Sequence, residues 1–355
     1  MQREGVRAVV DMSQLAVVGL VEVIRHIPRI YGEYRRLCRA IEANRPDVAI
    51  LTDSPDFHFR VARFIKNLPG RPIPVIYLVA PQAWAWRKGR IPQMRRLIDR
   101  LLCIFPFEEE FFRVRGVAAT YIGHPLAGFV RASTSREEFF ARHNLLADRP
   151  LVALLPGSRP GEVARHIPAL IQAAERMRAA QPVSFVLGLP LGFQLNEKVH
   201  SSFWERIRRS SIQVTEGRVT EGETWDILAH ADVALAASGT VTVEGALLGA
   251  PMVIFYRVTA LSWLLGKLLV RVPFYSMANL VAGRRVAPEL MQNEVTGERL
   301  AAEGLRLLRD PAARAAMRQE WSEVARRLSG REDPLMAAAD AVEQVLEKET
   351  VHAAS

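Results

Sequence analysis

Short apolar runs of strand length recur along the first part of the chain. They occupy residues 47–52, 74–80, 100–105 and 118–122, and amphipathic helical stretches separate several of them. Continuous apolar runs of this length are typical of strands in a parallel sheet that is buried on both faces. The pattern therefore predicts a parallel sheet covered by helices.

The alternation pauses after Pro125 and begins again near Pro150. Within the pause, Ser135 and Glu138 fit a capping box that opens a helix. The later pattern predicts strands at 150–155, 183–187, 213–215, 232–237 and 251–256, helices at 163–178 and 241–248, and a charged helical region beyond Glu298.

This repetition predicts an α/β fold with two doubly wound, Rossmann-like domains that face each other across a cleft. We expect an N-terminal domain at 1–145 and a C-terminal domain at 146–328. A C-terminal helix at 329–355 would pack back on the N-terminal domain. The length of 355 residues agrees with two domains, because single cores rarely grow beyond about 250 residues.

Composition narrows the possible partners without selecting one. The formal net charge is +9, which favours an anionic partner such as a phosphorylated ligand, a nucleic acid or a membrane surface. The basic residues are dispersed and form no recognised binding module, which argues against nucleic acid. The two cysteines, Cys38 and Cys103, predict reduced thiols in a cytosolic protein rather than a disulfide framework or zinc site.

No uncharged apolar run is long enough to predict a transmembrane helix. Two shorter apolar stretches, 15–25 and 261–271, have cations at their edges. The second contains Trp263, Lys267 and Arg271, so it fits either a helix lying at a membrane surface or a buried helix with cations reaching to solvent.

Two loops between a strand and a helix suit a bound phosphate. Ser238, Gly239 and Thr240 follow the strand at 232–237, and a helix begins at once, so hydroxyls and free amides would meet an anion there. Glu244, one turn into that helix, could accept hydrogen bonds from ribose hydroxyls. The alternative is that Ser238 and Thr240 only cap the helix.

The loop after the strand at 150–155 has a similar form. Ser158 is placed to cap the next helix, and Arg159 could clamp a diphosphate through paired hydrogen bonds or simply be exposed. Neither loop is a Walker A motif, and no G-x-G-x-x-G sequence occurs. The histidines show no metal-ligand spacing.

Candidate residues also follow the earlier strands. Asp53 or Asp56, after the strand at 47–52, could serve as a general base or could cap a turn. Gln82, Trp84 and Trp86 follow the strand at 74–80, where the tryptophans could frame a sugar or an acyl chain or could pack in the core. His124, at the end of the first α/β repeat, could be a hinge residue or could contact a ligand, and its position in the sequence does not distinguish the two.

Taken in order, these segments resemble the lipid-A-disaccharide synthase family. The matching pieces span nearly the whole chain: LAVVGLVEV at 15–23, TDSPDF at 52–57, WAWR at 84–87, FPFE at 105–108, GHPL at 123–126, LPGSR at 155–159, ASGT at 237–240 and NLVAGR at 279–284.

The resemblance implies a GT-B fold and an inverting, metal-independent transferase without a cofactor. Its substrates would be UDP-2,3-diacylglucosamine and 2,3-diacylglucosamine 1-phosphate, at the inner face of the inner membrane of a Gram-negative-type bacterium. Asp53 matches the catalytic carboxylate. Arg159 matches a residue tied to activity, and the residues matched to donor binding are Ser158, Arg159, Ser238, Gly239, Thr240, Glu244 and Asn279.

Two departures from the family pattern qualify these expectations. A glycine-rich opening of the type Gly-Glu-x-Ser-Gly-Asp after a first strand is absent, so the resemblance implies an N-terminal domain that lacks its first strand. The family's Ser-Pro-Ser-Val-Trp is Ala80-Pro-Gln-Ala-Trp84 here, which changes the acceptor side around Gln82, Trp84, Trp86 and Trp263. The alternatives are another UDP-sugar enzyme of this architecture, such as a peptidoglycan glycosyltransferase or a UDP-GlcNAc 2-epimerase, and an inactive chain that binds nucleotide or membrane only.

Overall fold

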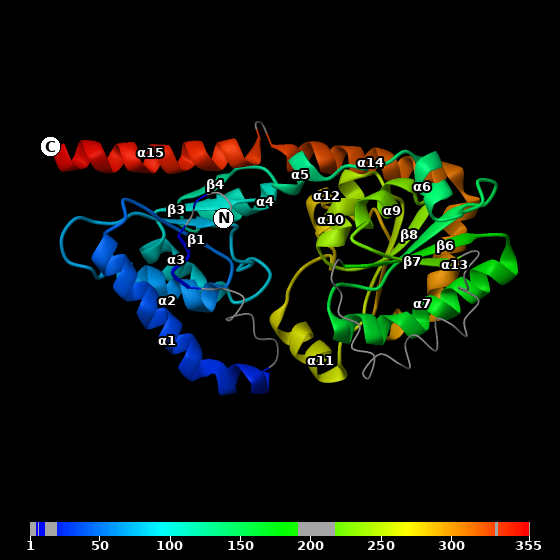
Figure 1. Cartoon of the computed structure of the whole chain (residues 1–355), viewed down its shortest axis with the longest axis horizontal. Coiled ribbons are helices and arrows are strands. Elements are labelled where there is room, and N and C mark those ends of the chain that lie inside the picture. Colours follow the sequence, from blue (N-terminus) through cyan, green and yellow to red (C-terminus); the bar gives the residue numbers. More distant parts are fainter. Residues whose placement is uncertain (1–4, 6, 11–19, 191–216, 331–332, 355) are drawn as a thin grey trace. The chain divides into compact units, whose positions relative to one another are not determined.

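A computed structural model describes residues 5, 7–10, 20–190, 217–330 and 333–354. They form two compact units, Met1–Ile122 with Glu332–Ser355, and Gly123–Arg331 (Figure 1). Each unit contains a parallel sheet and helices, so the predicted α/β class with two parallel sheets is confirmed. The predicted strand at 213–215 and the first residues of the apolar stretch at 15–25 lie outside the described residues.

The first unit is built on a four-stranded sheet in the order β1-β2-β3-β4, with every strand pair parallel. Its central strands are apolar on both faces, as Val75, Ile76 and Tyr77 of β2 are fully buried. Its elements are α1 (Leu20–Asn44), β1 (Ala49–Thr52), α2 (Pro55–Lys66), β2 (Val75–Leu78), η3 (Lys88–Arg90), α3 (Ile91–Leu97), β3 (Arg100–Cys103), α4 (Pro106–Arg113), β4 (Ala119–Tyr121) and α15 (Pro334–Ala354).

The second unit has a six-stranded parallel sheet in the order β10-β9-β8-β5-β6-β7. Two of its strands were not predicted: β7 has the largely polar sequence GRVTE at 217–221, and β10 is only three residues long and opens with a charged residue, Glu289. The elements are α5 (Leu126–Phe129), α6 (Arg136–Arg142), β5 (Leu151–Leu155), α7 (Pro160–Ala180), β6 (Ser184–Leu189), β7 (Gly217–Glu221), α9 (Thr224–His230), β8 (Val233–Ala237), α10 (Thr240–Leu247), β9 (Met252–Tyr256), α11 (Ala260–Leu269), α12 (Met277–Ala282), β10 (Glu289–Met291), η4 (Gln292–Glu294), α13 (Gly297–Arg309) and α14 (Pro311–Ser329).

The segment around α6 belongs to the second unit, so the division falls at 122/123 and not at the expected 145/146. The carboxylate of Asp226 in α9 accepts hydrogen bonds from the backbone N–H and hydroxyl of Ser133, at 2.6 and 2.5 Å. Arg136 forms an ion pair with Asp232 at 2.9 Å. These bonds explain the earlier boundary. The predicted capping box of Ser135 and Glu138 is present at the start of α6.

A buried carboxylate ties two loops together at the carboxyl edge of the first sheet. Glu108 in the first turn of α4 is 1% exposed. One of its oxygens accepts a hydrogen bond from the Trp84 indole N–H at 2.9 Å, and the other accepts from the backbone N–H groups of Ile104 and Phe105 at 3.2 and 3.1 Å. Burial raises the pKa of Glu108 to about 7, and these hydrogen bonds oppose part of the rise.

The raised pKa predicts a pH-dependent contribution of Glu108 to stability. The unfolded chain ionises this carboxyl near pH 4.5, whereas the folded chain holds the proton until about pH 7. The contribution is therefore complete below pH 4.5 and is lost as the pH rises through 7. Between pH 5 and pH 8, we expect the wild type to lose about 1–3 kcal/mol more unfolding free energy than Glu108→Gln.

Urea unfolding at both pH values measures this difference between the two proteins. Glu109→Gln is the matched control, because Glu109 is the next residue of α4 and its side chain is partly exposed. The control should follow the wild-type pH dependence. Parallel pH dependence of the wild type and Glu108→Gln would show that Glu108 is ionised throughout this range.

Candidate functional site

The two loops predicted to bind a phosphate lie next to each other in the second unit. They follow β5 and β8, which pair in parallel with Leu155 opposite Ala236. Both loops therefore leave the same edge of the sheet, and each leads directly into a helix, α7 or α10. The first amide groups of a helix have no intrahelical acceptor and carry partial positive charge. Two helix N-termini at one edge make a site that favours an anion.

The loop after β5 is shaped by Gly157 and Glu162. Gly157 has φ +113°, and a Cβ at this position would lie 2.8 Å from Glu162 Oε2 and 3.7 Å from Ala237 Cβ. This close approach brings the two loops into contact and requires glycine. Arg159, not Ser158, is the N-cap residue of α7. The helix therefore begins at Pro160, three residues before the predicted start at 163, and Ser158 lies exposed in the loop and does not cap it.

The Arg159 guanidinium is oriented by a neighbouring carboxylate while it stays accessible. It donates to Glu162 Oε1 at 2.9 Å, and its side chain is 68% exposed. The hydroxyl of Tyr256, at the end of β9, donates to the same oxygen at 2.9 Å. Burial would raise the pKa of Glu162, but the hydrogen bonds from Tyr256 and Arg159 outweigh it and lower that pKa. Glu162 thus stays anionic and holds Arg159 at the start of α7.

His166 holds the loop after β5 by hydrogen bonds from the protein interior. This role was not predicted from the sequence. His166 is fully buried in α7. Nδ1 donates to the carbonyl of Pro156 at 2.7 Å, and Nε2 lies 3.0 Å from the backbone nitrogen and 3.1 Å from the carbonyl oxygen of Arg257. Because a carbonyl only accepts, the contact with Pro156 places a proton on Nδ1, and in the neutral ring Nε2 accepts from the Arg257 N–H. Burial lowers the pKa of His166, in agreement with that state.

The loop after β8 carries Ser238, Gly239 and Thr240, and the last two are exposed. Gly239 is the N-cap of α10 without a side-chain cap, and no heavy atom lies within 4 Å of a Cβ built on it. The Ser238 hydroxyl donates to the carbonyl of Tyr275 at 2.9 Å. The helix start is therefore open, and neither Ser238 nor Thr240 acts as the simple helix cap considered as an alternative.

Asn279 is fully buried and holds the segment between α12 and β10 instead of lying at the surface. Its amide nitrogen donates to the Ala287 carbonyl and to Glu289, each at 2.9 Å. Its amide oxygen accepts from the backbone N–H groups of Val286 and Ala287. Glu289 of β10 also accepts from Tyr275 and Ser276. A direct contact between the Asn279 amide and a ligand would require these bonds to break.

Glu244 lies half-buried in α10, one turn after the open helix start. Burial raises the pKa of its carboxyl above the ordinary value, and a hydrogen bond from the side chain of Trp225 opposes the rise. Glu244 therefore lies on the same helix as the second loop, in a position and environment that suit a hydrogen-bond acceptor for a neutral hydroxyl group.

In the first unit, the structure separates the two aspartates that the sequence left as alternatives. Asp56 forms ion pairs with Arg87 and Arg90. Burial would raise its pKa, but the hydrogen bonds and charges of these arginines outweigh it and lower that pKa. Asp53 follows the carboxyl end of β1, is exposed, and its carboxylate makes no hydrogen bond or ion pair with the described residues. Asp53 is the carboxylate left available for chemistry.

The residues after β2 divide into buried and exposed ones. Trp84 is 9% exposed, and its indole packs edge-on against Phe107 with ring centroids 5.0 Å apart. Trp84 therefore packs in the core, which was the alternative to framing a sugar or an acyl chain. Gln82 and Trp86 are exposed. The guanidinium of Arg87 lies 4.3 Å from the Trp86 ring centroid.

In the second unit, His124 is buried and accepts from the backbone N–H of Leu126.

The helix α11 presents an apolar surface. The exposed fractions of Leu264, Leu265, Leu268 and Leu269 are 59%, 50%, 68% and 59%. Trp263 packs against Tyr275 with ring centroids 5.6 Å apart, and Lys267 Nζ lies 5.4 Å from the Trp263 ring centroid. Of the two alternatives, the exposure excludes an ordinary buried helix. Tyr275 also connects α11 to the second loop, because its carbonyl accepts from Ser238.

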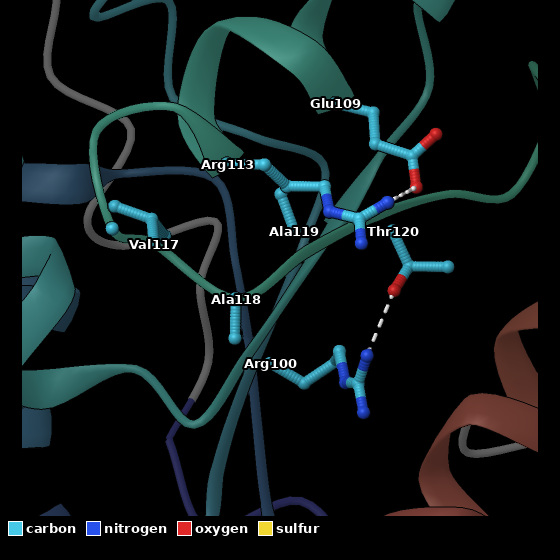
Figure 2. A pocket seen from close by; sticks show the side chains of 8 residues that line it. Arg100, Glu109, Arg113, Val117, Ala118, Ala119 and Thr120 are labelled. Atoms are coloured by element: carbon cyan, nitrogen blue, oxygen red, sulfur yellow. Dashed lines mark hydrogen bonds and ion pairs between the residues drawn. The ribbon is translucent and has the colours of Figure 1, made fainter.

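A cavity of about 460 Å³ lies elsewhere in the first unit, at the amino ends of β3 and β4. Arg100 donates to Thr120 there, and Arg113 pairs with Glu109 (Figure 2). Asp53 lies at the opposite, carboxyl edge of this sheet. Among the described residues, no group of His, Cys, Asp and Glu side chains is arranged to hold a metal, and no helix is long and apolar enough to cross a membrane.

Comparisons with known proteins agree with the resemblance noted in the sequence. The family described as lipid-A-disaccharide synthetase matches residues 1–343. A lipid-A-disaccharide synthase of Solibacter usitatus is 58% identical over 98% of this chain and 88% of its own length. One of Koribacter versatilis is 41% identical over 93% of this chain and 84% of its own length.

A solved structure, a UDP-GlcNAc 2-epimerase from Neisseria meningitidis bound to UDP-GlcNAc, shares the fold. Its TM-score is 0.55 at 13% identity, over 90% of this chain and 82% of that one. At this identity the likeness concerns the fold alone. The family match and the close relatives go further, and they show that the chain belongs to the lipid-A-disaccharide synthase family.

Proposed function

We propose that the chain joins UDP-2,3-diacylglucosamine to 2,3-diacylglucosamine 1-phosphate and releases UDP, as a lipid-A-disaccharide synthase. The observation that carries the proposal is the family match over residues 1–343, which includes Asp53 and both anion-binding loops. The first unit supplies the proton acceptor, and the second unit supplies the donor site.

The donor diphosphate occupies the adjoining starts of α7 and α10. The charge that develops on the leaving UDP is stabilised by the exposed Arg159 guanidinium, by the amides of Gly239 and Thr240, and by the helix dipoles. Ser158 lies in the same loop. Glu244 accepts a ribose hydroxyl, and Asn279 acts through the loop it holds. Preorganised donors of this kind supply the electrostatic stabilisation that a metal ion supplies in other transferases, so the reaction is metal-independent.

Asp53 accepts the proton from the 6-hydroxyl of the acceptor as that oxygen attacks the anomeric carbon. The attack comes from the face opposite the leaving diphosphate, so a single displacement inverts the configuration. The support for Asp53 over Asp56 is the difference in their partners, because two arginines already neutralise Asp56. Gln82 and Trp86, exposed after the neighbouring strand β2, are candidates for contact with the acceptor.

A second candidate function follows from the fold. A UDP-GlcNAc 2-epimerase shares this architecture, and such an enzyme would act on an unacylated donor. The 58% identity with a lipid-A-disaccharide synthase outweighs a fold shared at 13%. An assay with acylated and unacylated UDP-sugars separates the two, since an epimerase releases a changed UDP-sugar without any acceptor.

The exposed leucines of α11 support attachment to a membrane that contains the acylated substrates. Trp263, these leucines and Lys267 have the composition of a helix at a lipid interface, and the net charge of +9 favours anionic lipids. These features support the proposal that the enzyme works as a peripheral protein on the cytoplasmic side of the inner membrane. Because Trp263 packs on Tyr275, α11 adjoins the donor loop.

Removal of the exposed cation at the donor loop should reduce the rate of transfer. Arg159→Ala should lower kcat by roughly 10²–10³, as loss of one electrostatic donor to a transition state does. Disaccharide formation from both acylated substrates measures the effect. Arg176→Ala, an exposed arginine further along α7, is the matched control and should retain the wild-type rate. A rate within about threefold of the wild type for Arg159→Ala would remove Arg159 from the mechanism.

Loss of the proposed base should leave donor binding intact. Asp53→Asn should reduce kcat by roughly 10²–10⁴, the contribution of a general base, while the dissociation constant of UDP stays unchanged. Calorimetry measures UDP binding alongside the rate. Asp47→Asn changes an exposed carboxylate just before β1, at its opposite end, and serves as the control. Full activity of Asp53→Asn would contradict the proposed role.

The apolar face of α11 should determine vesicle binding. The double substitution Leu264→Ser and Leu268→Ser should weaken flotation with vesicles that contain anionic phospholipid, because less apolar area enters the interface. Leu335→Ser with Met336→Ser is the control, since it removes a pair of apolar side chains from α15 that are also at least half exposed. Equal flotation of the wild type and the α11 variant would mean that α11 does not contact lipid.

A further inference from the structure

The backbone at Asp53 adopts a conformation that residues other than glycine rarely take. Asp53 has φ +57° and the next residue, Ser54, has φ +37°. Pro55 begins α2 directly afterwards, and a following proline disfavours the right-handed helical conformation at Ser54. Two successive left-handed residues are unfavourable, and they persist only where the surroundings hold them. Such backbone is concentrated at functional sites.

Two buried side chains hold this conformation through one atom, the carbonyl oxygen of Asp53. The hydroxyl of Tyr77 donates to it at 2.5 Å, and Nδ1 of His58 lies 2.8 Å from it. Tyr77 is fully buried and His58 is 9% exposed. Tyr77 belongs to β2, which pairs with β1 and places Tyr77 opposite Leu51. His58 lies one turn into α2, so the oxygen is held from the adjacent strand β2 and from the helix that follows Asp53.

The two donors orient the carbonyl of Asp53 toward the protein interior. With the backbone held in this way, the side chain of the same residue is exposed at the carboxyl edge of the sheet. A buried carbonyl that lost its donors would be unsatisfied, and the chain would relax toward a conformation with a solvated carbonyl. The carboxylate would move with it.

We propose that Tyr77 and His58 are positioning residues that fix the Asp53 carboxylate for proton transfer by holding its backbone carbonyl. This inference rests on the proposed function of Asp53 as the general base. Both residues act through Asp53 and touch neither substrate.

The chemistry of both donors agrees with that role. Burial raises the pKa of Tyr77, and the negative charge of Asp53 raises it further, so the phenol remains a protonated donor at physiological pH. The contact from His58 fixes its proton on Nδ1, because a carbonyl oxygen only accepts. The Tyr77 ring also packs against Phe59 and His58, with centroids 5.7 and 6.5 Å away. A phenylalanine would keep those ring contacts and lose only the hydroxyl.

Tyr77→Phe should therefore lower kcat by roughly tenfold to a hundredfold, the effect of a displacement of about 1 Å at a reacting group. The KM values and the dissociation constant of UDP should change by less than about twofold. Tyr34→Phe is the matched control, because its hydroxyl interacts with Cys38 in the same unit and not with the Asp53 carbonyl; it should keep the wild-type kcat. His58→Phe retains an aromatic ring without the donor and should act in the same direction as Tyr77→Phe.

A double-mutant cycle separates this inference from the proposed function. In the D53N background, Tyr77→Phe should have no further effect on the rate, because the group it positions is already lost. If D53N alone keeps full activity, the base assignment is wrong. If D53N is slow while Tyr77→Phe keeps kcat within about twofold, the positioning role is wrong. Equal losses from Tyr77→Phe in both backgrounds would also overturn it. All rates are measured below the melting transition of each variant.

Discussion

Every loop that leaves the carboxyl edge of a buried parallel sheet carries backbone groups that need hydrogen-bond partners. In this protein buried side chains satisfy many of them. Glu108 accepts from two amides after β3, Glu289 accepts from two amides before α12, and His166 joins the loops after β5 and β9. An unsatisfied buried amide or carbonyl costs about 1–3 kcal/mol. Bonds of this kind also hold the loops that expose the site residues: His166 holds the loop of Arg159, Glu289 holds Tyr275, which bonds Ser238 beside Gly239, and Tyr77 and His58 hold the carbonyl of Asp53.

The arrangement of strands could be predicted from the sequence because it depends on local pattern. Apolar runs of four to six residues mark most of the strands, and loops that follow a strand and precede a helix mark the ligand edge of a parallel sheet. The strand β10 escaped prediction, since a three-residue strand that begins with Glu289 carries no apolar pattern. The positions of Asp53, Arg159 and Gly239 at that edge followed from the same rule.

The partners of individual side chains could not be predicted, because they depend on which strands pair and in what register. The residue pattern alone left Asp53 and Asp56 as alternatives, and their difference in partners depends on the positions of Arg87 and Arg90, which pair with Asp56. Trp84 and Trp86 lie two residues apart, yet one donates to buried Glu108 and the other is exposed. Asn279 matches a residue tied to donor binding, whereas here its amide holds the backbone of residues 286–287.

The strand order of the second sheet also has a consequence for how the protein folds. The pairs β5–β6, β6–β7, β8–β9 and β9–β10 join segments that are close in sequence, whereas β5–β8 joins the most widely separated of all the pairs. Closing that long loop costs more chain entropy than any other pairing, so the two halves of the sheet tend to form before they meet. The starts of α7 and α10 become neighbours only at that step. The chain should therefore bind nucleotide only late on the folding pathway. A nucleotide present during folding would stabilise the completed sheet relative to its separate halves.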